Sequence, residues 1–182
     1  MIDEEKKAIR RQIREKKKDY SLEEKKRKSE LIFNQIEKLD AFKKAEIIMV
    51  YWSLNDEVFT QRFIQKYQNK KKIILPVVEG DILILKEFTG LSNMKISKSF
   101  GIGEPEGILF DQSDKIDVII VPGLAFDKSL NRLGRGKAYY DKLLKKSQAL
   151  KIGVCFDFQE LESVPVDEYD VKMDLVITDK SY

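Results

Sequence analysis

The sequence predicts an α/β protein with a three-layer, Rossmann-like fold, in which a helical N-terminal segment precedes a mostly parallel sheet. Three observations predict this fold. The length of 182 residues suits one domain with a substantial core. Six short apolar runs are separated mostly by helix-like or loop-like stretches, as in parallel sheets with helical crossovers. Two helical patterns come before the first run. We therefore expect residues 1–182 to form a single domain in which residues 1–40 pack as helices on the α/β core.

The two N-terminal helices are predicted from apolar spacing and from a capping signal. Ile9 and Ile13 stand four residues apart, so they share one side of the first helix. Ser21 and Glu24 form an S-x-x-E capping box, which predicts the start of a second helix. Apolar residues keep helical spacing as far as about Leu39. We expect this second helix to lie against a core while its lysines face water.

The later part of the chain is predicted to supply the sheet. The six runs are AEIIMVYWS (45–53), KKIILPVV (71–78), DILILKEF (81–88), IDVIIVPGLAF (116–126), KIGVCFD (151–157) and MDLVITD (173–179). They have the length and the β-branched content of buried strands. Residues 59–70 and 139–144 have helical spacing instead. The sequence EGD at 79–81 indicates a hairpin, so one strand is expected to be antiparallel.

The composition excludes several kinds of catalytic and metal site. The chain contains no histidine, which removes the Ser-His-Asp and Cys-His arrangements and every metal site that includes histidine. Its single cysteine, Cys155, lies in an apolar stretch and is interpreted as a buried structural thiol. Any catalysis must therefore use Lys, Arg, Asp, Glu or Tyr.

The charge distribution indicates solvated helices at the N-terminus. The formal net charge is +3, and residues 1–30 hold twelve Lys or Arg against eight Asp or Glu. Such mixed charge favours a solvated helical face over a nucleic-acid-binding stripe. No run approaches the roughly 18 continuous apolar residues of a membrane span, and the start lacks the apolar region of a secretory signal. We expect a cytoplasmic protein with no membrane partner, and the charge pattern disfavours a nucleic-acid partner.

One basic, glycine-containing stretch follows the fourth predicted strand. Its sequence is NRLGRGKAYYDKLLKK, residues 131–146, and it is predicted to begin a helix. Ligands of open α/β sheets gather where strands end, glycines let backbone amides approach a phosphate, and Arg135 and Lys137 add full charges. The stretch matches neither the P-loop nor G-x-G-x-x-G, since Ala138 and Tyr139 occupy the diagnostic places. From the residues alone, phosphate binding and a simple basic turn are equally favoured.

Four other residues have both a structural and a functional interpretation. Asp141 stands four residues after Lys137, so it can form a helical ion pair or, together with Asp170, hold Mg²⁺ through carboxylate oxygens. Glu57 can begin a helix or accept hydrogen bonds from an amino-substituted heterocycle. Phe100 can fill the core or stack on a flat ring. By themselves, the two aspartates favour the structural interpretation.

Taken together, several stretches resemble one family over nearly the whole chain. They are the K-x-x-x-R that begins at Lys6, then NDEVFT, FGIGEP, VPGLAFD followed by NRLGRGKAYYD, and finally VPVDEYDVKMD. This set resembles the 5-formyltetrahydrofolate cyclo-ligase family, also called 5,10-methenyltetrahydrofolate synthetase. The resemblance implies an enzyme, an ATP-dependent ligase, that uses Mg²⁺ to convert 5-formyltetrahydrofolate into 5,10-methenyltetrahydrofolate. It also implies that ADP and phosphate are released and that the reaction passes through a phosphorylated formyl group, an iminium phosphate.

The resemblance also assigns roles to individual residues. Nucleotide binding is implied for Lys6, Arg10, Arg132, Gly134, Arg135, Gly136, Lys137, Tyr139 and Tyr140. Within that set, Arg135 and Lys137 are the residues expected to hold the transferring phosphoryl group. Folate binding is implied for Trp52, Glu57, Phe100 and Tyr139. The magnesium carboxylates are Asp141 and Asp170.

Two positions depart from the family pattern, and two other functions stay open. Ala138 stands where members often have glycine, and its Cβ is harmless in a helical backbone but can crowd a phosphate if the position needs a positive φ. Phe100 stands where some relatives have tryptophan. A related enzyme acting on another amide, or a nucleotide- or RNA-binding module without catalysis, remains an alternative. We expect a monomer.

Overall fold

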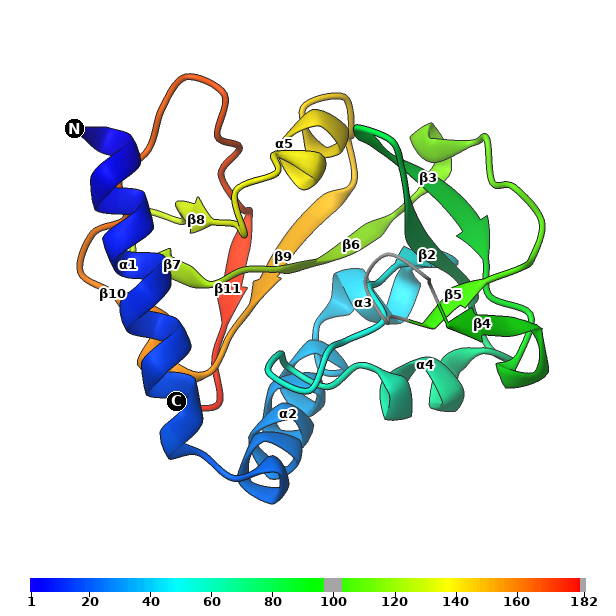
Figure 1. The fold of residues 1–182 in the computed structure, drawn as a ribbon. Helices are drawn as coiled ribbons and strands as arrows, with labels where there is room; N and C mark the ends of the chain where they lie inside the picture. The colour runs from blue at the N-terminus through cyan, green and yellow to red at the C-terminus, as the bar shows by residue number, and fades with distance from the viewer. Residues whose placement is uncertain (97–102, 181–182) are drawn as a thin grey trace.

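The computed structural model describes residues 1–96 and 103–180, and its centre is a six-stranded sheet (Figure 1). The strands lie in the order β11-β9-β6-β1-β2-β3. Their bounds are β1 Ile47–Met49, β2 Lys72–Glu79, β3 Ile82–Glu87, β6 Val118–Pro122, β9 Leu150–Val154 and β11 Leu175–Ile177. Every pairing is parallel except β2 with β3, which is antiparallel. The prediction of a mostly parallel sheet with one hairpin is confirmed, and Gly80 makes the hairpin turn at φ 59°.

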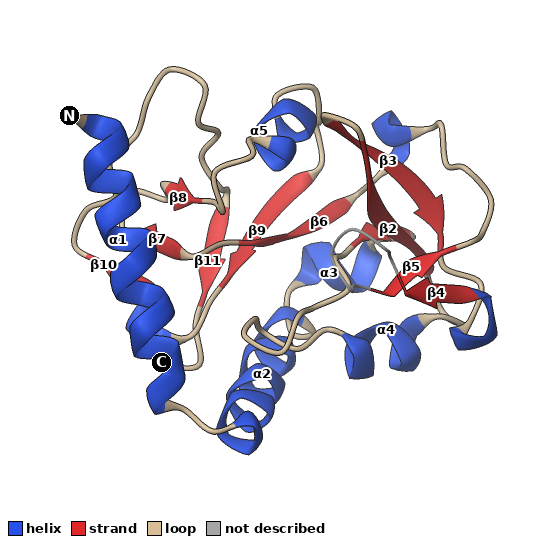
Figure 2. Cartoon of the chain, in the orientation of Figure 1, coloured by secondary structure: helices blue, strands red, loops and turns tan. Residues whose placement is uncertain are grey.

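Helices cover both faces of this sheet, which gives the three predicted layers (Figure 2). One face packs against α2 (Leu22–Ile36), α3 (Asp40–Lys44) and α4 (Gln61–Tyr67), where Ile32, Ile36 and Phe63 join the largest buried cluster. The other face packs against α5 (Tyr139–Leu144), which contributes Leu144 to a second buried cluster. Burial of the strands on both faces explains their nearly continuous apolar sequences.

The N-terminal helix α1 (Ile2–Lys16) lies beside the central sheet and packs on a second, smaller sheet (Figure 1). This second sheet has the order β10-β7-β8, formed by β7 (Ala125–Asp127), β8 (Arg132–Leu133) and β10 (Glu160–Leu161). Ile13 is fully buried against it, and Ile9 packs at the margin. The predicted shared side of Ile9 and Ile13 is confirmed.

The helix boundaries follow their local signals. Ser21 and Glu24 make the reciprocal capping box that was predicted, with the Ser21 Oγ accepting from the Glu24 N–H at 3.2 Å. The second helix ends at Ile36 instead of Leu39, because the chain turns there and Leu39 precedes the separate helix α3. No helix in the described ranges is long and apolar enough to cross a membrane.

Short elements complete the described chain. A two-stranded sheet pairs β4 (Met94–Ile96) with β5 (Gly103–Pro105). Four 3₁₀ turns lie between the larger elements: η1 Lys17–Asp19, η2 Leu91–Asn93, η3 Ser113–Lys115 and η4 Asp157–Gln159.

The expectation that residue 131 begins a helix is wrong. Arg132 and Leu133 form strand β8, and the helix α5 starts only at Tyr139 and has six residues. Between them the backbone takes left-handed values, with φ 99° at Gly136 and φ 53° at Ala138. Such values cannot continue a right-handed helix, so the stretch is a turn that leads into a short helix.

Candidate functional site

The predicted site residues gather where the chain changes direction within the sheet. From β1 the chain continues to β2 on one side, and it later returns to β6 on the other side of β1. In open α/β sheets, the loops after two such strands enclose the usual ligand site. The loop of residues 50–60 follows β1, and the loop from residue 123 onward follows β6, so both lie at this edge.

The loop after β1 is held in shape by reciprocal hydrogen bonds. The Ser53 N–H donates to the Thr60 Oγ1, and the Thr60 N–H donates to the Ser53 Oγ, both at 3.1 Å. The Leu54 N–H donates to the Glu57 Oε2 at 2.9 Å. These contacts fix the backbone that carries Asp56 and Glu57, and they leave the Glu57 Oε1 to accept from Arg135.

Arg135 spans from the glycine turn to this loop. Its guanidinium donates to the Asp56 carboxylate at 2.9 and 3.1 Å, and to the Glu57 Oε1 at 3.0 and 3.2 Å. Burial opposes ionisation of Arg135, but the two carboxylates outweigh it and raise its pKa above the usual value. The structure therefore brings a predicted phosphate residue, Arg135, against a predicted folate residue, Glu57.

A second cation, Lys17, reaches the same carboxylate from the N-terminal segment. The Lys17 Nζ lies 3.2 Å from the Asp56 Oδ2, and the Lys17 side chain is 3% exposed. Burial lowers the pKa of Lys17, and Asp56 offsets only part of that effect. Burial would raise the pKa of Asp56, but Lys17 and Arg135 together hold it below its usual value.

The sequence interpretation missed both Asp56 and Lys17. Asp56 stands inside NDEVFT beside Glu57, so the same loop signal could have included it. Lys17 belongs to a run of three lysines, and the helical pattern alone does not indicate which of them turns inward.

Lys6 joins the first helix to the C-terminal loop. Its Nζ lies 2.7 Å from the Asp167 Oδ2 and 2.5 Å from the Asp170 Oδ2. Burial opposes the Lys6 charge, yet the hydrogen bonds that Lys6 donates to both carboxylates raise its pKa overall. A residue implied for nucleotide binding and a residue implied for magnesium are thus paired with each other.

Arg132 and Asp141 make a second such pair. The Arg132 Nη2 lies 2.8 Å from the Asp141 Oδ2, and both side chains are almost fully buried. The Asp141 Oδ1 accepts a hydrogen bond from the Val171 N–H at 3.3 Å, so Asp141 lies next to the segment that carries Asp170. Asp141 therefore pairs with Arg132, and the possible helical pair with Lys137 is not formed, because Lys137 precedes the helix.

Arg10 and the two glycines of the turn lie in contact. The Arg10 Nε donates to the Gly134 carbonyl oxygen at 2.9 Å. A Cβ at Gly136 would stand 3.4 Å from the Arg10 Cζ, and the φ of 99° there also favours glycine. On the other side of the turn, a Cβ at Gly134 would stand 3.0 Å from an Arg132 nitrogen. The glycines thus allow two guanidinium groups to approach the turn closely.

The remaining residues of the turn point in different directions. Lys137 is exposed. The Tyr139 hydroxyl donates to the Gly80 carbonyl oxygen at 3.3 Å, so Tyr139 faces the β2-β3 hairpin. The Tyr140 hydroxyl is buried without a hydrogen-bond partner in the described chain, and burial, together with Glu57, raises its pKa. The Arg132 guanidinium lies 5.6 Å from the centre of the Tyr140 ring.

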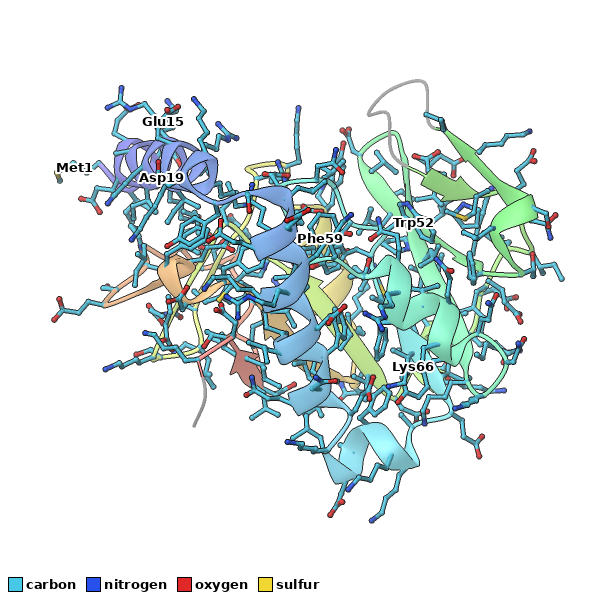
Figure 3. The ribbon with its side chains drawn as sticks, turned by 90° about the horizontal axis from the view of Figure 1, so that it is seen from below. Met1, Glu15, Asp19, Trp52, Phe59 and Lys66 are labelled. Atoms are coloured by element: carbon cyan, nitrogen blue, oxygen red, sulfur yellow. The ribbon has the colours of Figure 1, made fainter. Side chains whose placement is uncertain are left out.

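Trp52, for which folate binding was predicted, lies at the start of the loop after β1. Its ring packs 6.0 Å from that of Phe88, and a Cβ at Gly103 would come within 2.8 Å of its Nε1. Figure 3 shows Trp52 near α4, on the opposite side of α2 from Met1. Phe100, the other predicted aromatic wall, lies outside the described residues.

The carboxylates present fit the needs of a magnesium ion. Mg²⁺ takes one or two protein carboxylates and keeps waters or phosphate oxygens as its other ligands. Asp141 and Asp170 supply two carboxylates from adjoining segments. Across residues 1–96 and 103–180, no three His, Cys, Asp or Glu side chains form a ready-made metal group.

The fold and the grouping of these residues define an α/β enzyme whose polar side chains meet at the switch point of a parallel sheet. A family model described as the 5-formyltetrahydrofolate cyclo-ligase family matches residues 2–179. The chain belongs to this family. The sequence-based recognition is confirmed, as is the expectation that the protein is an enzyme of the ligase class.

Relatives and solved structures agree with this family. The chain is 29% identical over 195 residues to the mouse 5-formyltetrahydrofolate cyclo-ligase, covering 99% of this chain and 96% of the relative. The solution structure of an Aquifex aeolicus 5,10-methenyltetrahydrofolate synthetase aligns with a TM-score of 0.86 and 36% identity, covering 97% of this chain and 90% of that one. The corresponding Mycoplasma pneumoniae enzyme aligns with a TM-score of 0.78 and 28% identity, over 96% and 99% of the two chains.

Proposed function

We propose that this protein converts 5-formyltetrahydrofolate into 5,10-methenyltetrahydrofolate, with ATP cleaved to ADP and phosphate. One observation carries the proposal. In a member of the cyclo-ligase family, Arg135 of the glycine turn contacts Glu57 of the loop after β1 at 3.0 Å. The group proposed to hold the phosphoryl and the group proposed to hold the pterin are therefore neighbours, as direct transfer between two bound substrates requires.

The proposed phosphate site consists of the cations around the turn. Arg10, Arg135 and Lys137 would bind the triphosphate, and the glycines would let backbone N–H groups approach it. The helix α5 has only six residues, so its dipole adds little, and side-chain charge supplies most of the attraction. Phosphoryl transfer depends chiefly on alignment and on neutralising spread negative charge, which these residues can provide without histidine.

The two ion pairs of Lys6 and Arg132 suggest an exchange of partners on binding. Lys6 is paired with Asp170, and Arg132 is paired with Asp141. In the proposed complex, phosphate oxygens would attract the cations, and Asp141 and Asp170 would hold Mg²⁺, which would neutralise further charge on the phosphates. Each charge would then exchange one partner of opposite sign for another, so none is left uncompensated.

The chemistry follows from making the formyl oxygen a better leaving group. The formyl oxygen attacks the γ-phosphorus, the bond to ADP breaks, and an iminium phosphate forms at N5. The N10 amine then attacks the activated carbon, its proton is lost, and phosphate departs as the ring closes. Glu57 would orient the pterin by accepting hydrogen bonds from its N–H groups, and Trp52 would form an apolar wall.

The test is to measure the formation of methenyltetrahydrofolate through its absorbance. We expect turnover with 5-formyltetrahydrofolate, ATP and Mg²⁺ together, and none when ATP is omitted. Stoichiometric release of ADP and phosphate should accompany product. Turnover of another formamide but not of 5-formyltetrahydrofolate would instead identify a relative with a changed substrate. Absence of any ATP cleavage with either substrate would refute the proposal.

A further inference from the structure

Lys17 is a buried cation to which the proposed reaction assigns no role. We propose that Lys17 is a positioning residue that holds Asp56 in place and compensates its charge, so that Arg135 can turn from Asp56 toward the triphosphate. That the triphosphate belongs to ATP rests on the proposed function. The inference concerns a residue to which the family resemblance assigns no role.

The local structure turns this one lysine inward. Lys17 begins the 3₁₀ turn η1 directly after α1, and its side chain is 3% exposed. Its neighbours behave differently: Lys18 pairs with the exposed Glu15, and Lys16 lies over the ring of Phe158. Burying an ammonium group is costly unless an opposite charge is paired with it. The burial of Lys17 is therefore favourable only because Asp56 is its partner.

Asp56 is shared by two cations. Its Oδ2 lies 3.2 Å from the Lys17 Nζ and 3.1 Å from an Arg135 nitrogen, while its Oδ1 lies 2.9 Å from the same nitrogen. Arg135 sits on a turn, and its side chain is 40% exposed, so it has room to move. Lys17 is enclosed and comes from a different element. The geometry therefore contains one fixed partner and one movable partner of the same carboxylate.

This arrangement matters when a triphosphate arrives. If Arg135 turned to a phosphate and Asp56 had no other cation, an uncompensated carboxylate would remain beside a highly charged anion. That repulsion would weaken nucleotide binding, and Asp56 would also compete more strongly for Arg135. With Lys17 in place, Asp56 keeps a partner throughout. The low pKa of Asp56 agrees with its compensation by both cations.

The experiment compares Lys17→Met with the wild type by ATP titration calorimetry and by turnover. We expect Lys17→Met to raise both the Kd and the KM for ATP by about 10-fold to 100-fold, the range typical of hydrogen bonds to charged groups. The value of kcat at saturating ATP should change much less. Lys17→Arg should restore most of the affinity, because it keeps the charge. Lys28→Met is the matched control, since Lys28 is a largely buried lysine paired with Asp157 and Asp179.

A double variant separates positioning from a general loss of stability. In Lys17→Met/Asp56→Asn the uncompensated carboxylate is gone, so the ATP affinity should return toward that of Asp56→Asn alone. Thermal unfolding of each variant reports its stability independently. Additive effects of the two substitutions, or an unchanged ATP affinity in Lys17→Met, would overturn the inference. Absence of ATP binding by the wild type would instead overturn the proposed function, and this inference with it.

Discussion

At the scale of single residues, Ala138 is an alanine in a backbone conformation that favours glycine. Its φ of 53° and ψ of 16° lie in the left-handed region, so the concern raised by the sequence, that this position needs a positive φ, is confirmed. An L-residue there is strained by roughly 1–2 kcal/mol. The strain is located between Lys137 and the start of α5, inside the proposed phosphate turn.

We expect Ala138→Gly to raise the free energy of unfolding by up to about 1 kcal/mol. The substitution relieves the strained backbone, and the greater freedom of glycine in the unfolded chain offsets part of that gain. Urea denaturation measures the change. Ala41→Gly, at an exposed position of α3, is the control and should destabilise the protein by roughly 0.5–1 kcal/mol. A loss of stability in Ala138→Gly would show that the left-handed conformation carries no net strain.

A second prediction concerns Arg135 and Lys137, the exposed cations of the glycine turn. Arg135→Ala and Lys137→Ala should each lower kcat/KM by about 10²–10³-fold, because each removes a charge proposed to act on the transferring phosphoryl group. The free energy of unfolding should change by less than about 1 kcal/mol for the exposed Lys137, and by more for Arg135, whose partner Glu57 is only 13% exposed. The measurements are steady-state turnover and urea denaturation.

Arg62→Ala is the control for these two variants. Arg62 is also exposed and pairs with Glu30, but it lies on α4 and makes no hydrogen bond or ion pair with any proposed site residue in the described part of the chain. Its turnover should match the wild type. Wild-type turnover in both Arg135→Ala and Lys137→Ala would remove these residues from the mechanism.

At the scale of elements, Asp127 organises the connection from β7 to β8. Its Oδ1 accepts from the Ser129 and Asn131 N–H groups at 2.9 and 3.0 Å. Its Oδ2 accepts from the Asn131 side chain and from the Val164 N–H, both at 2.9 Å. Burial would raise the pKa of Asp127, but these hydrogen bonds lower it overall. The loop so held leads directly into Arg132 and the glycine turn.

We expect Asp127→Asn to lower the free energy of unfolding by about 1–3 kcal/mol at pH 7. Because the pKa of Asp127 is lower in the folded protein, its contribution is fully present above the unfolded value of roughly 3.9 and is lost as the pH falls through the folded value. The difference between wild type and variant should therefore shrink from about pH 5 downward. Urea denaturation at several pH values measures it, with the exposed Asp81→Asn as control. A difference that stays constant down to pH 3 would contradict the assignment.

The sequence predicted the elements that have strong local signals and missed those that depend on distant partners. The capping box at Ser21 was sufficient to place the start of α2, and the six apolar runs were sufficient to place the main strands. Strand β8 has two residues, Arg132 and Leu133, and forms only because β7 lies beside it, so no periodic pattern could indicate it. The inward turn of Lys17 likewise depends on Asp56, 39 residues away in the chain. Family resemblance named the candidate site residues, but it did not indicate that their cations and carboxylates are paired with one another.

At the scale of the whole molecule, we propose that residues 1–182 unfold as one unit, with the N-terminal helices as part of the core. Ile13 of α1 and Ile32 of α2 are fully buried in clusters that include residues of the later chain. Lys6 and Lys28 add ion pairs to the C-terminal segment. Such long-range contacts favour a single cooperative transition.

The paired charges predict that nucleotide stabilises the whole fold and that magnesium strengthens the effect. A ligand at 100 times its Kd adds about 2.7 kcal/mol to the free energy of unfolding. We expect ATP with Mg²⁺ to raise Tm clearly, and ATP with a chelator to raise it much less, because Asp141 and Asp170 would then face the triphosphate without a cation. AMP, which lacks the β- and γ-phosphates, is the control. An equal Tm shift with and without Mg²⁺ would exclude these carboxylates as its ligands.

The contact between Lys6 and Asp170 joins two segments that are made at very different times during translation. A ribosome that has produced α1, the strands as far as β9 and the glycine turn has not yet made Asp170, one of the two carboxylates proposed to hold Mg²⁺. We therefore expect the growing chain to gain the ability to cleave ATP only after residues 167–170 have been made and can contact Lys6 of α1.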